Sequence, residues 1–359
     1  MASWSVFKAC NRQAMLSNRA LPRAAPPSTI ASRRHHIMKK SCLSMQRLAA
    51  LLVGGLLTTL ATTAAAAPKT NLTLGSTNMT SSHFVVSNAM AQAIRAGIPG
   101  ATVTHVETGA SVDNIRRLAR GELDLGLVAT DAGIQAVSGT GFFKGKAVND
   151  LVALYAYDVS VLNMAVTQAS GVTSLAGLKG KRFNPGIHGS GAEQLTRQIF
   201  KTFDIEPQWV PGTVKDAAEA IQNRQIVGYS KYGPGHGVDA TLRELMVTTP
   251  MRLLSFDKPE QDKVMHAVKG VGFTQIPNVM EGAGPVMAPS VLIVYATRKS
   301  LMDDDTAYAI AKSIYEHRDL LIQAWPHLKN FDFKQQSLAA AKLGIPVHPG
   351  ALRFWESVK

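Results

Sequence analysis

From residue 71 onward, short apolar runs alternate with amphipathic helical stretches, and this alternation limits the possible folds more than any other feature. In the segment THVETGASVDNIRRLARGELDLGLV (104–128), a strand pattern, a turn of small residues, a helical pattern and a second strand pattern follow one another. Two parallel strands with a crossover helix between them form a right-handed unit in nearly all known cases. The chain is therefore expected to be an α/β protein with mostly parallel sheets flanked by helices.

The spacing of the apolar residues places the individual elements. The expected strands are 72–74, 103–107, 123–128, 152–155, 161–166, 181–184, 227–229, 253–255 and 292–296. The expected helices are 82–96, 112–120, 191–203, 215–223, 237–246, 304–316 and 335–343.

Two segments are candidates for passages between two lobes. LYAYDVSVLNMAV (154–166) precedes a fresh series of strands and helices, and a return is expected near 285–295. A chain of 359 residues is long enough to build two lobes, each with its own core. The expected boundaries are 68–157 plus 290–359 for lobe 1, and 158–289 for lobe 2.

The positive charge of the chain is concentrated in its first part. Residues 1–67 contain nine Lys or Arg and no Asp or Glu, so the formal charge of +13 falls to +4 for residues 68–359. That second part has no cluster of Lys or Arg that would follow a phosphate backbone. We therefore expect no nucleic-acid partner.

The first part reads as an export signal. A basic region begins at Met38 and ends at Arg47, an apolar run of 13 residues follows (48–60), and ATTAAAAP supplies a cleavage site after Ala66 or Ala67. The apolar run is shorter than the ~20 residues that span a membrane. Residues 38–67 are thus expected to be a signal peptide, and 1–37 an extension upstream of the true start. An organellar transit peptide is the alternative, because this region is rich in Arg and free of acids.

Both cysteines, Cys10 and Cys42, precede the expected cleavage site. Disulfides, thiolate metal sites and lipidation at the cleavage site are therefore not expected in the exported chain. Its histidines show no spacing typical of a metal site, and we expect neither a metal nor another cofactor. The product is predicted to be periplasmic, without stable membrane insertion.

Three loops each follow an expected strand and precede an expected helix: 75–82 (GSTNMTSS), 108–111 (TGAS) and 184–191 (NPGIHGSG). Helix N-termini present unpaired N–H groups and the positive end of the helix dipole, which favours an anion there. Small residues let the oxygens of an anion approach the backbone. We expect a carboxylate near the amides of residues 110–112 and 189–191. In the alternative, these residues only shape turns and cap helices.

Nucleotide binding and hydrolysis do not fit these loops. NPGIHGSGAEQ lacks the Lys-Ser/Thr ending of a P-loop and the third Gly of a dinucleotide fingerprint. Ser190 is not in a G-x-S-x-G context, and no acid or base partner can be assigned to it. We find no catalytic constellation and do not expect an enzyme.

Four further side chains are candidates for a cleft wall. Lys231 and Tyr232 lie after a strand in GYSKYGPGHGVDATLREL (228–245), where they offer a counter-charge, a hydroxyl and a stacking face. His188 could donate to an anion, and Tyr155 lies at the expected lobe passage. The alternatives are a surface lysine, a solvent-exposed loop histidine and a structural tyrosine.

Several motifs in this order resemble the TAXI class of solute receptors, which serve TRAP transporters. The most specific are TGASVDNIRRLARGELDLGLVATD (108–131) and SLAGLKGKRFNPGIHGSGAEQL (174–195), and IPVHPGALRFW (345–355) agrees as well. The resemblance covers residues 70–355. It implies a two-lobed periplasmic-binding-protein type II fold, a ligand between the lobes, and delivery to a permease driven by an ion gradient. Known ligands of the class are small carboxylates and acidic amino acids such as glutamate and 2-oxoglutarate.

The resemblance also implies site residues. On the first-lobe side these are Thr108, Ser111 and Val112, with Thr130 and Asp131 on the loop after GLV. On the second-lobe side they are Gly189, Ser190 and Gly191.

The chain departs from the class at two places. Its first loop lacks the aromatic residues and further glycines common there, and Ala129 replaces the usual Gln. The solute would then be recognised through Ser76, Thr77, Asn78 and Ser82. We therefore expect an organic anion without assigning glutamate.

Three rival functions share these features. The same fold could serve an ABC importer or a ligand sensor, it could carry a secreted or organellar enzyme, or it could be an antigenic surface protein.

Overall fold

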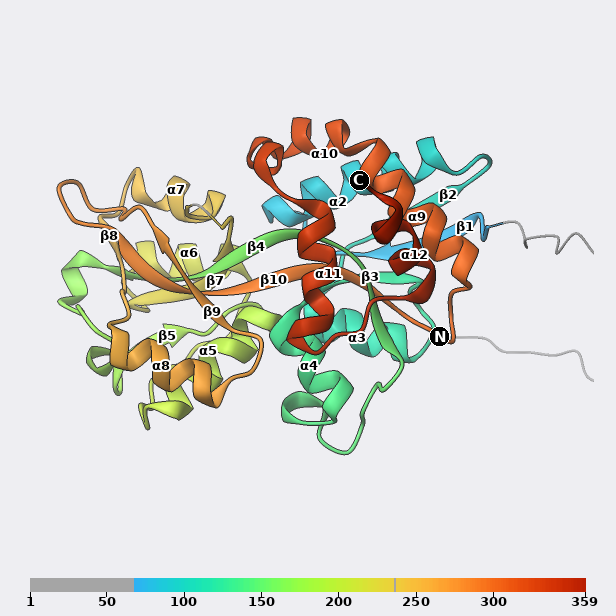
Figure 1. The fold of residues 1–359 in the computed structure, drawn as a ribbon. Helices are drawn as coiled ribbons and strands as arrows, with labels where there is room; N and C mark the ends of the chain where they lie inside the picture. The colour runs from blue at the N-terminus through green and yellow to red at the C-terminus, as the bar shows by residue number, and fades with distance from the viewer. Residues whose placement is uncertain (1–67, 236) are drawn as a thin grey trace, which may run out of the picture. The chain divides into compact units, whose positions relative to one another are not determined.

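The computed structural model describes residues 68–235 and 237–359, coloured from blue to red in Figure 1. The expected signal peptide, its cleavage site, the upstream extension and both cysteines lie outside the described residues.

The first group of parallel strands is the one predicted from the alternation. β1 (Asn71–Gly75) pairs in parallel with β2 (Thr102–Val106) and β3 (Leu125–Ala129). The crossovers are α2 (Ser82–Gly97) and α3 (Ser111–Ala119). The α/β fold expected from the sequence is confirmed in this group.

A second parallel group forms later in the chain. β5 (Arg182–Asn184) lies between β6 (Gln208–Trp209) and β7 (Gly228–Gly233) and is parallel to both. The helices α5 (Gly191–Thr202) and α6 (Val214–Gln222) connect these strands. β6 is too short to show a hydrophobic period, and it was not predicted from the sequence.

Two long antiparallel strands join the groups into one mixed sheet. β4 (Leu151–Thr167) and β10 (Val286–Arg298) run side by side in Figure 1. The strand order is β2-β1-β3-β10-β4-β7-β5-β6, with β8 (Met251–Leu253) on β4 and β9 (Gly272–Ile276) on β10. The expected lobe boundaries fall inside β4 and β10, and the division into lobes stays a proposal.

The prediction of separate strands at 152–155 and 161–166 was wrong, because β4 is continuous through both. Asp158 and Ser160, which lie between the two predicted strands, are polar. In the structure, however, the buried Asp158 carboxylate accepts from Ser160 Oγ and lies 3.0 Å from His327 Nε2. A satisfied polar group can be buried in the middle of a strand.

Helices cover the sheet, and some of them were not predicted. The predicted ones include α7 (Ala240–Met246), α9 (Asp304–Glu316) and α11 (Phe333–Leu343). The missed ones are α4 (Thr130–Ser138), α8 (Lys258–Ala267), α10 (Arg318–Ala324) and α12 (Pro349–Ser357).

The core next to β4 and β10 contains a cluster of aromatic residues. The rings of Tyr155 and Tyr295 stack with centroids 5.3 Å apart, and Tyr155 Oη donates to Met90 Sδ over 3.5 Å. Trp355 Nε1 donates to the carbonyl of Leu154 over 2.8 Å. Tyr155, a predicted cleft residue, is therefore a buried core residue, because both its ring and its hydroxyl have partners inside the protein.

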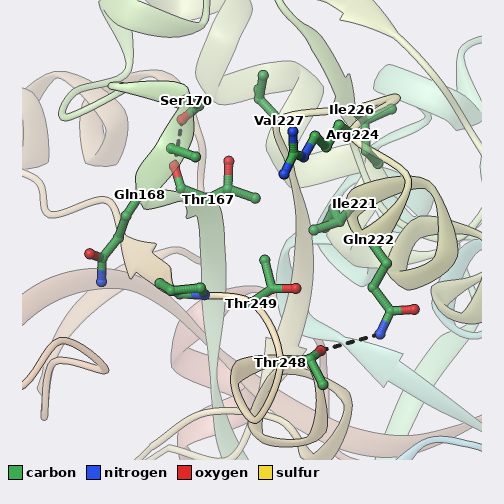
Figure 2. Close-up of a pocket in the computed structure, with 12 residues that line it drawn as sticks. Thr167, Gln168, Ser170, Ile221, Gln222, Arg224, Ile226, Val227, Thr248 and Thr249 are labelled. Atoms are coloured by element: carbon green, nitrogen blue, oxygen red, sulfur yellow. Dashed lines mark hydrogen bonds between the residues drawn. The ribbon is translucent and has the colours of Figure 1, made fainter.

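Two hollows flank β7. A small cavity lies by its last residues, at Lys231 and Tyr232. A wider, open pocket lies by Val227, which precedes its first residue (Figure 2).

Candidate functional site

The small cavity brings together residues from all three loops singled out in the sequence. Its volume is about 40 Å³. Six predicted residues line it: Thr77, Ser111, Ser190, Gly191, Lys231 and Tyr232. The other lining residues are Ser81, His83, Ala110, Leu127, Ile187, Ala192, Ser230 and Ile293.

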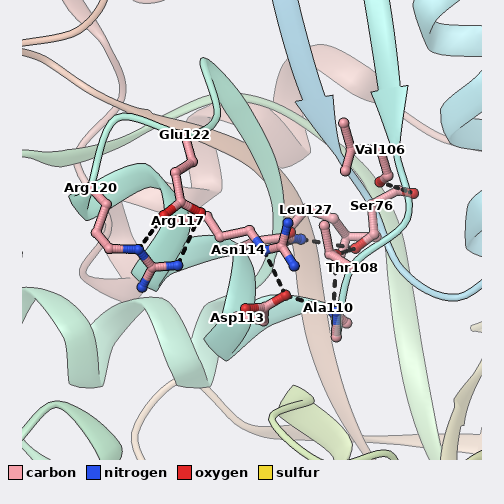
Figure 3. A network of polar contacts seen from close by, with 11 residues as sticks. Ser76, Val106, Thr108, Ala110, Asp113, Asn114, Arg117, Arg120, Glu122 and Leu127 are labelled. Atoms are coloured by element: carbon pink, nitrogen blue, oxygen red, sulfur yellow. Dashed lines mark hydrogen bonds and ion pairs between the residues drawn. The ribbon is translucent and has the colours of Figure 1, made fainter. Parts of the chain in front are cut away.

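Ser76 and Thr108 hold two of these loops together instead of lining the cavity. The Ser76 carbonyl accepts from Thr108 Oγ1 (2.9 Å) and from Asn114 Nδ2 (2.8 Å), as Figure 3 shows. Ser76 Oγ lies 2.7 Å from His105 Nε2. The loop after β1 is thus fastened to the start of α3, and its hydroxyl and carbonyl are occupied.

Most amides at the start of α3 are already engaged. Gly109 N donates to Asp113 Oδ2 (3.0 Å), and Ala110 N donates to Thr108 Oγ1 (3.2 Å). Val112 N donates to the Gly189 carbonyl over 3.2 Å, which joins the start of α3 to the loop before α5. The Ser111 amide makes no hydrogen bond within the described residues.

At the start of α5, too, most backbone amides already donate hydrogen bonds within the protein. Ser190 is the N-cap, since its Oγ accepts from Glu193 N (3.1 Å), and its own amide donates to the Ile187 carbonyl (3.0 Å). Gly189 N donates to Glu193 Oε2 (2.8 Å). The amide of Gly191 has no partner in the part of the chain that the structure describes.

These contacts correct the expectation that six amides at 110–112 and 189–191 face an anion. Two amides are available, those of Ser111 and Gly191. They start helices that face one another: a Cβ placed on Gly191 would lie 3.2 Å from Ser111 Oγ and 3.3 Å from Tyr232 Cε2. Ser111 Oγ accepts from Ala129 N over 2.9 Å, so this hydroxyl is also in use.

His188 does not line the cavity. Its side chain is 87% exposed, and Nδ1 lies 3.5 Å from Glu193 Oε2. The His188 ring points toward solvent. This agrees with the alternative expectation of a solvent-exposed loop histidine. Next to it, Gly189 has φ 78°, a conformation that strongly favours glycine.

Lys231 and Tyr232 lie on β7 itself and not on a loop, because the strand continues to Gly233. Lys231 Nζ is 3.2 Å from Asp239 Oδ1, both side chains are buried, and the other oxygen of Asp239 accepts from Tyr229 Oη (3.1 Å). The lysine is therefore neutralised within the protein and is not a free counter-charge for a ligand.

Two hydroxyls of β7 at the cavity have no partner at hydrogen-bond geometry among the described residues, Ser230 Oγ and Tyr232 Oη. Burial and the nearby Asp131 carboxyl raise the pKa of Tyr232, so its hydroxyl interacts with that carboxyl. Buried polar groups are nearly always paired, so Ser230 Oγ is the hydroxyl left available to a solute or to water.

Asp131 is the second residue of α4 and is fully buried, although it does not line the cavity. Neither carboxylate oxygen has a partner at hydrogen-bond geometry among the described residues. Burial raises the pKa of Asp131 to about 7, and the amides of Asp131 and Ala132 and the Tyr232 hydroxyl only partly oppose this. The carboxyl is thus largely protonated below neutral pH.

His83, in the first turn of α2, lines the cavity although it was not among the predicted site residues. Nδ1 lies 2.9 Å from Tyr157 Oη and Nε2 lies 3.2 Å from Ser160 Oγ. Burial, opposed by the charge of Asp158 and assisted by that of Lys231, lowers the pKa of His83 to about 4. The cavity wall therefore contains a neutral imidazole. No local pattern in the sequence indicates it, since its partners come from β4.

The remaining predicted residues do not reach the cavity. Asn78 and Ser82 are half-buried beside it, and Val112 packs in the core under α3. Thr130 Oγ1 donates to the Gly270 carbonyl (3.3 Å) and accepts from Leu292 N (3.2 Å), so it links α4 to two other segments.

The small volume has a direct consequence for binding. About 40 Å³ holds roughly three water molecules, less than a small carboxylate requires. A solute can enter only if the loops separate. Among the contacts between these loops is the hydrogen bond from Val112 N to Gly189 O.

Within residues 68–235 and 237–359, no three His, Cys, Asp or Glu side chains are grouped so that they could hold a metal ion. In the same part of the chain, no helix has the length and apolar character needed to cross a membrane.

Comparisons with known proteins place this geometry in context. The model of the NMT1-like family matches residues 74–357. Among solved structures, the alkanesulfonate-binding protein SsuA of Xanthomonas axonopodis pv. citri is similar, with 18% identity over 81% of this chain and 85% of that one and a TM-score of 0.45. A TRAP periplasmic solute-binding protein of a Sulfitobacter species, with bound β-D-galacturonate, has 12% identity over 79% and 93% and a TM-score of 0.40.

Proposed function

Since the chain belongs to the NMT1-like family, which has the periplasmic-binding-protein type II fold, we propose that it is the solute-binding component of a membrane transporter. Its solute is a small organic anion, bound at the cavity between α3, α5 and β7. The protein releases this solute to a permease in the membrane.

The observation that supports the proposal is the pair of helix starts that face one cavity. The amides of Ser111 and Gly191 are unengaged, and each stands at the positive end of a helix. The unpartnered hydroxyl of Ser230 lies on the adjacent strand, and so does the hydroxyl of Tyr232, which neighbours the Asp131 carboxyl. A carboxylate or sulfonate would accept from the amides, and polar groups on the rest of the solute would reach the hydroxyls.

We further propose a TRAP transporter of the TAXI type as the partner, on the strength of the motif resemblance over residues 70–355. An ABC importer is the second candidate. Ala129 and the small residues after β1 depart from the TAXI pattern, and two amides receive a sulfonate as well as a carboxylate. A neighbouring gene for a fused multi-span permease would support the first candidate, and one for an ATPase the second.

A thermal-shift screen tests solute binding. The panel contains glutamate, 2-oxoglutarate, short alkanesulfonates and, as controls, uncharged amides of the same size. A solute that binds only the folded protein stabilises it by ~2.7 kcal/mol at a hundredfold excess over Kd. We expect at least one anion, and none of the amides, to raise the melting temperature. Equal effects of anions and amides, or no effect of either, would contradict the proposal.

A further inference from the structure

The open pocket beside Val227, which we call the outer pocket, has a volume of about 510 Å³. Three connections build it: the segment after β4 (167–170), the link from α6 to β7 (222–227) and the link from α7 to β8 (248–250). It lies at the start of β7, whereas the cavity of the proposed transport site lies at the end of that strand. The two share no lining residue.

The outer pocket contains one unpaired positive charge. Figure 2 shows the guanidinium of Arg224 turned toward the middle of the lining residues. No carboxylate of residues 68–235 or 237–359 is within ion-pair distance of it, and no Asp or Glu lines the pocket. Other Arg side chains of the described residues do have such partners, for example Arg298 with Asp150 at 2.8 Å.

The backbone holds Arg224 in an unfavourable conformation. After α6 ends, Arg224 N donates to the Ile221 carbonyl (2.9 Å) and Gln225 N to the Ala220 carbonyl (2.7 Å). Arg224 closes this turn with φ 54°, in the left-handed region where glycine or asparagine is the ordinary choice. A bulky residue there is a reason to look for a role of its side chain.

Neutral donors surround the guanidinium. The hydroxyls of Thr167 and Thr249 make no hydrogen bond with the described residues, and Gln222 Nε2 reaches Thr248 Oγ1 only at 3.5 Å. Hydroxyl and amide groups of this kind pair with the hydroxyls of a ligand, while a guanidinium grips a carboxylate or phosphate with two parallel bonds.

We propose that the outer pocket is a second binding site, for a small hydroxylated anion such as a sugar acid, with the acid group on Arg224 and the hydroxyls on the threonines. The site is independent of the proposed transport site, because it uses other residues and another end of β7.

The test is a titration of the isotope-labelled full-length protein with gluconate, followed by amide chemical shifts. Glucitol, which has the same hydroxyls and no acid group, is the matched probe. We expect saturable shifts at Thr167, Val227 and Thr249 with gluconate and none with glucitol. Shifts confined to Ser111 and Gly191 would place gluconate in the cavity and overturn the second site, while leaving the proposed transport function intact.

Three variants test whether the guanidinium of Arg224 binds the acid group of gluconate. Arg224→Gln should weaken gluconate binding at least tenfold, since a charge-assisted pair is lost. Arg224→Gly should weaken it as much without lowering the melting temperature, because glycine relieves the left-handed backbone. Lys342→Gln, which removes an exposed charge from α11, should leave the affinity for gluconate unchanged. The proposal would be overturned if Arg224→Gly bound gluconate as tightly as the wild type, or if Lys342→Gln lost as much gluconate affinity as the Arg224 variants. It would also be overturned if chloride caused the same chemical-shift changes as gluconate. Each of these results would mean an adventitious ion only.

Discussion

Replacing Asp131 by Asn should stabilise the protein at alkaline pH and change its stability much less in acid. The carboxyl is fully buried, and its pKa is raised from 3.8 to about 7. At 1.36 kcal/mol for each pH unit, this rise corresponds to roughly 4 kcal/mol. Asn has the same shape without the charge, so the variant avoids that cost.

The sign follows from which state binds the proton. Below pH 3.8, Asp131 is protonated whether the chain is folded or unfolded, and it contributes nothing to the pH dependence. Between pH 3.8 and about 7 the unfolded chain loses this proton while the folded chain keeps it, so stability falls by about 1.4 kcal/mol per pH unit. Above pH 7 the loss is complete and constant.

The pKa shift of His83 changes the pH dependence of stability in the opposite direction, over nearly the same pH range as that of Asp131. Its pKa falls from 6.5 to about 4 on folding, so the folded chain resists a proton that the unfolded chain accepts. Stability therefore rises between pH 4 and 6.5, by roughly 3 kcal/mol in total. The two slopes largely cancel in the wild type. In Asp131→Asn, the rise caused by His83 should stand alone.

The assay is guanidinium unfolding followed by tryptophan fluorescence, at pH 4.5 and pH 8. The expected gain of Asp131→Asn in unfolding free energy is roughly 1 kcal/mol at pH 4.5 and roughly 4 kcal/mol at pH 8. Asp319→Asn, which changes an exposed carboxylate at the start of α10, serves as the control and should show no such difference. An equal gain for Asp131→Asn at both pH values would refute the reasoning.

Three further outcomes follow from contacts in the site and the sheet. Ser111→Asp should weaken binding of the solute found in the screen by tenfold or more in calorimetry, because it sets a negative charge beside the amides that would hold the anion; unchanged affinity would exclude the start of α3 as the anion site. Asp239→Asn should cost about 3 to 5 kcal/mol in denaturant unfolding, because Lys231 then stays buried without its partner, and Lys231→Met added to it should recover most of the loss; a double variant as unstable as the single one would contradict this. Gly228→Ala should lower the melting temperature strongly, because its Cβ would lie 2.1 Å from the Ala165 carbonyl oxygen, whereas Gly284→Ala has open space and should be nearly neutral; similar melting temperatures of the two variants would count against the strand register.

The parts of the fold that were predicted are those with a local signal. β1, α2, β2, α3 and β3 follow from the apolar period, and α9 matches the expected 304–316. α8 was missed although the sequence marks its start, since Asp257 and Glu260 form a capping box around it. α4 has no such mark: it begins directly after β3, and Ala129 offers no capping side chain.

The residues of the candidate site also separate into those with a local signal in the sequence and those without one. Thr77, Ser111, Ser190 and Gly191 were found because loops before helices carry a recognisable pattern of small residues. The state of Lys231 could not be found this way, because its partner Asp239 is a neighbour only after β7 and the following turn bring them together. The sequence indicates which groups are present, but not which of them the fold has already paired.

That pairing changes how binding must work. In this structure, Val112 N donates to Gly189 O, and Thr130 Oγ1 donates to Gly270 O. Each such bond stabilises the present arrangement of the segments by about 0.5 to 1.5 kcal/mol even without a solute. A solute shifts the balance between two forms of a protein only by the difference in its affinity for the two. In the proposed binding mode, an anion would therefore have to gain more from the Ser111 and Gly191 amides than the loops gain from each other, and weakening the Val112–Gly189 contact would change the solute-free population without removing either donor.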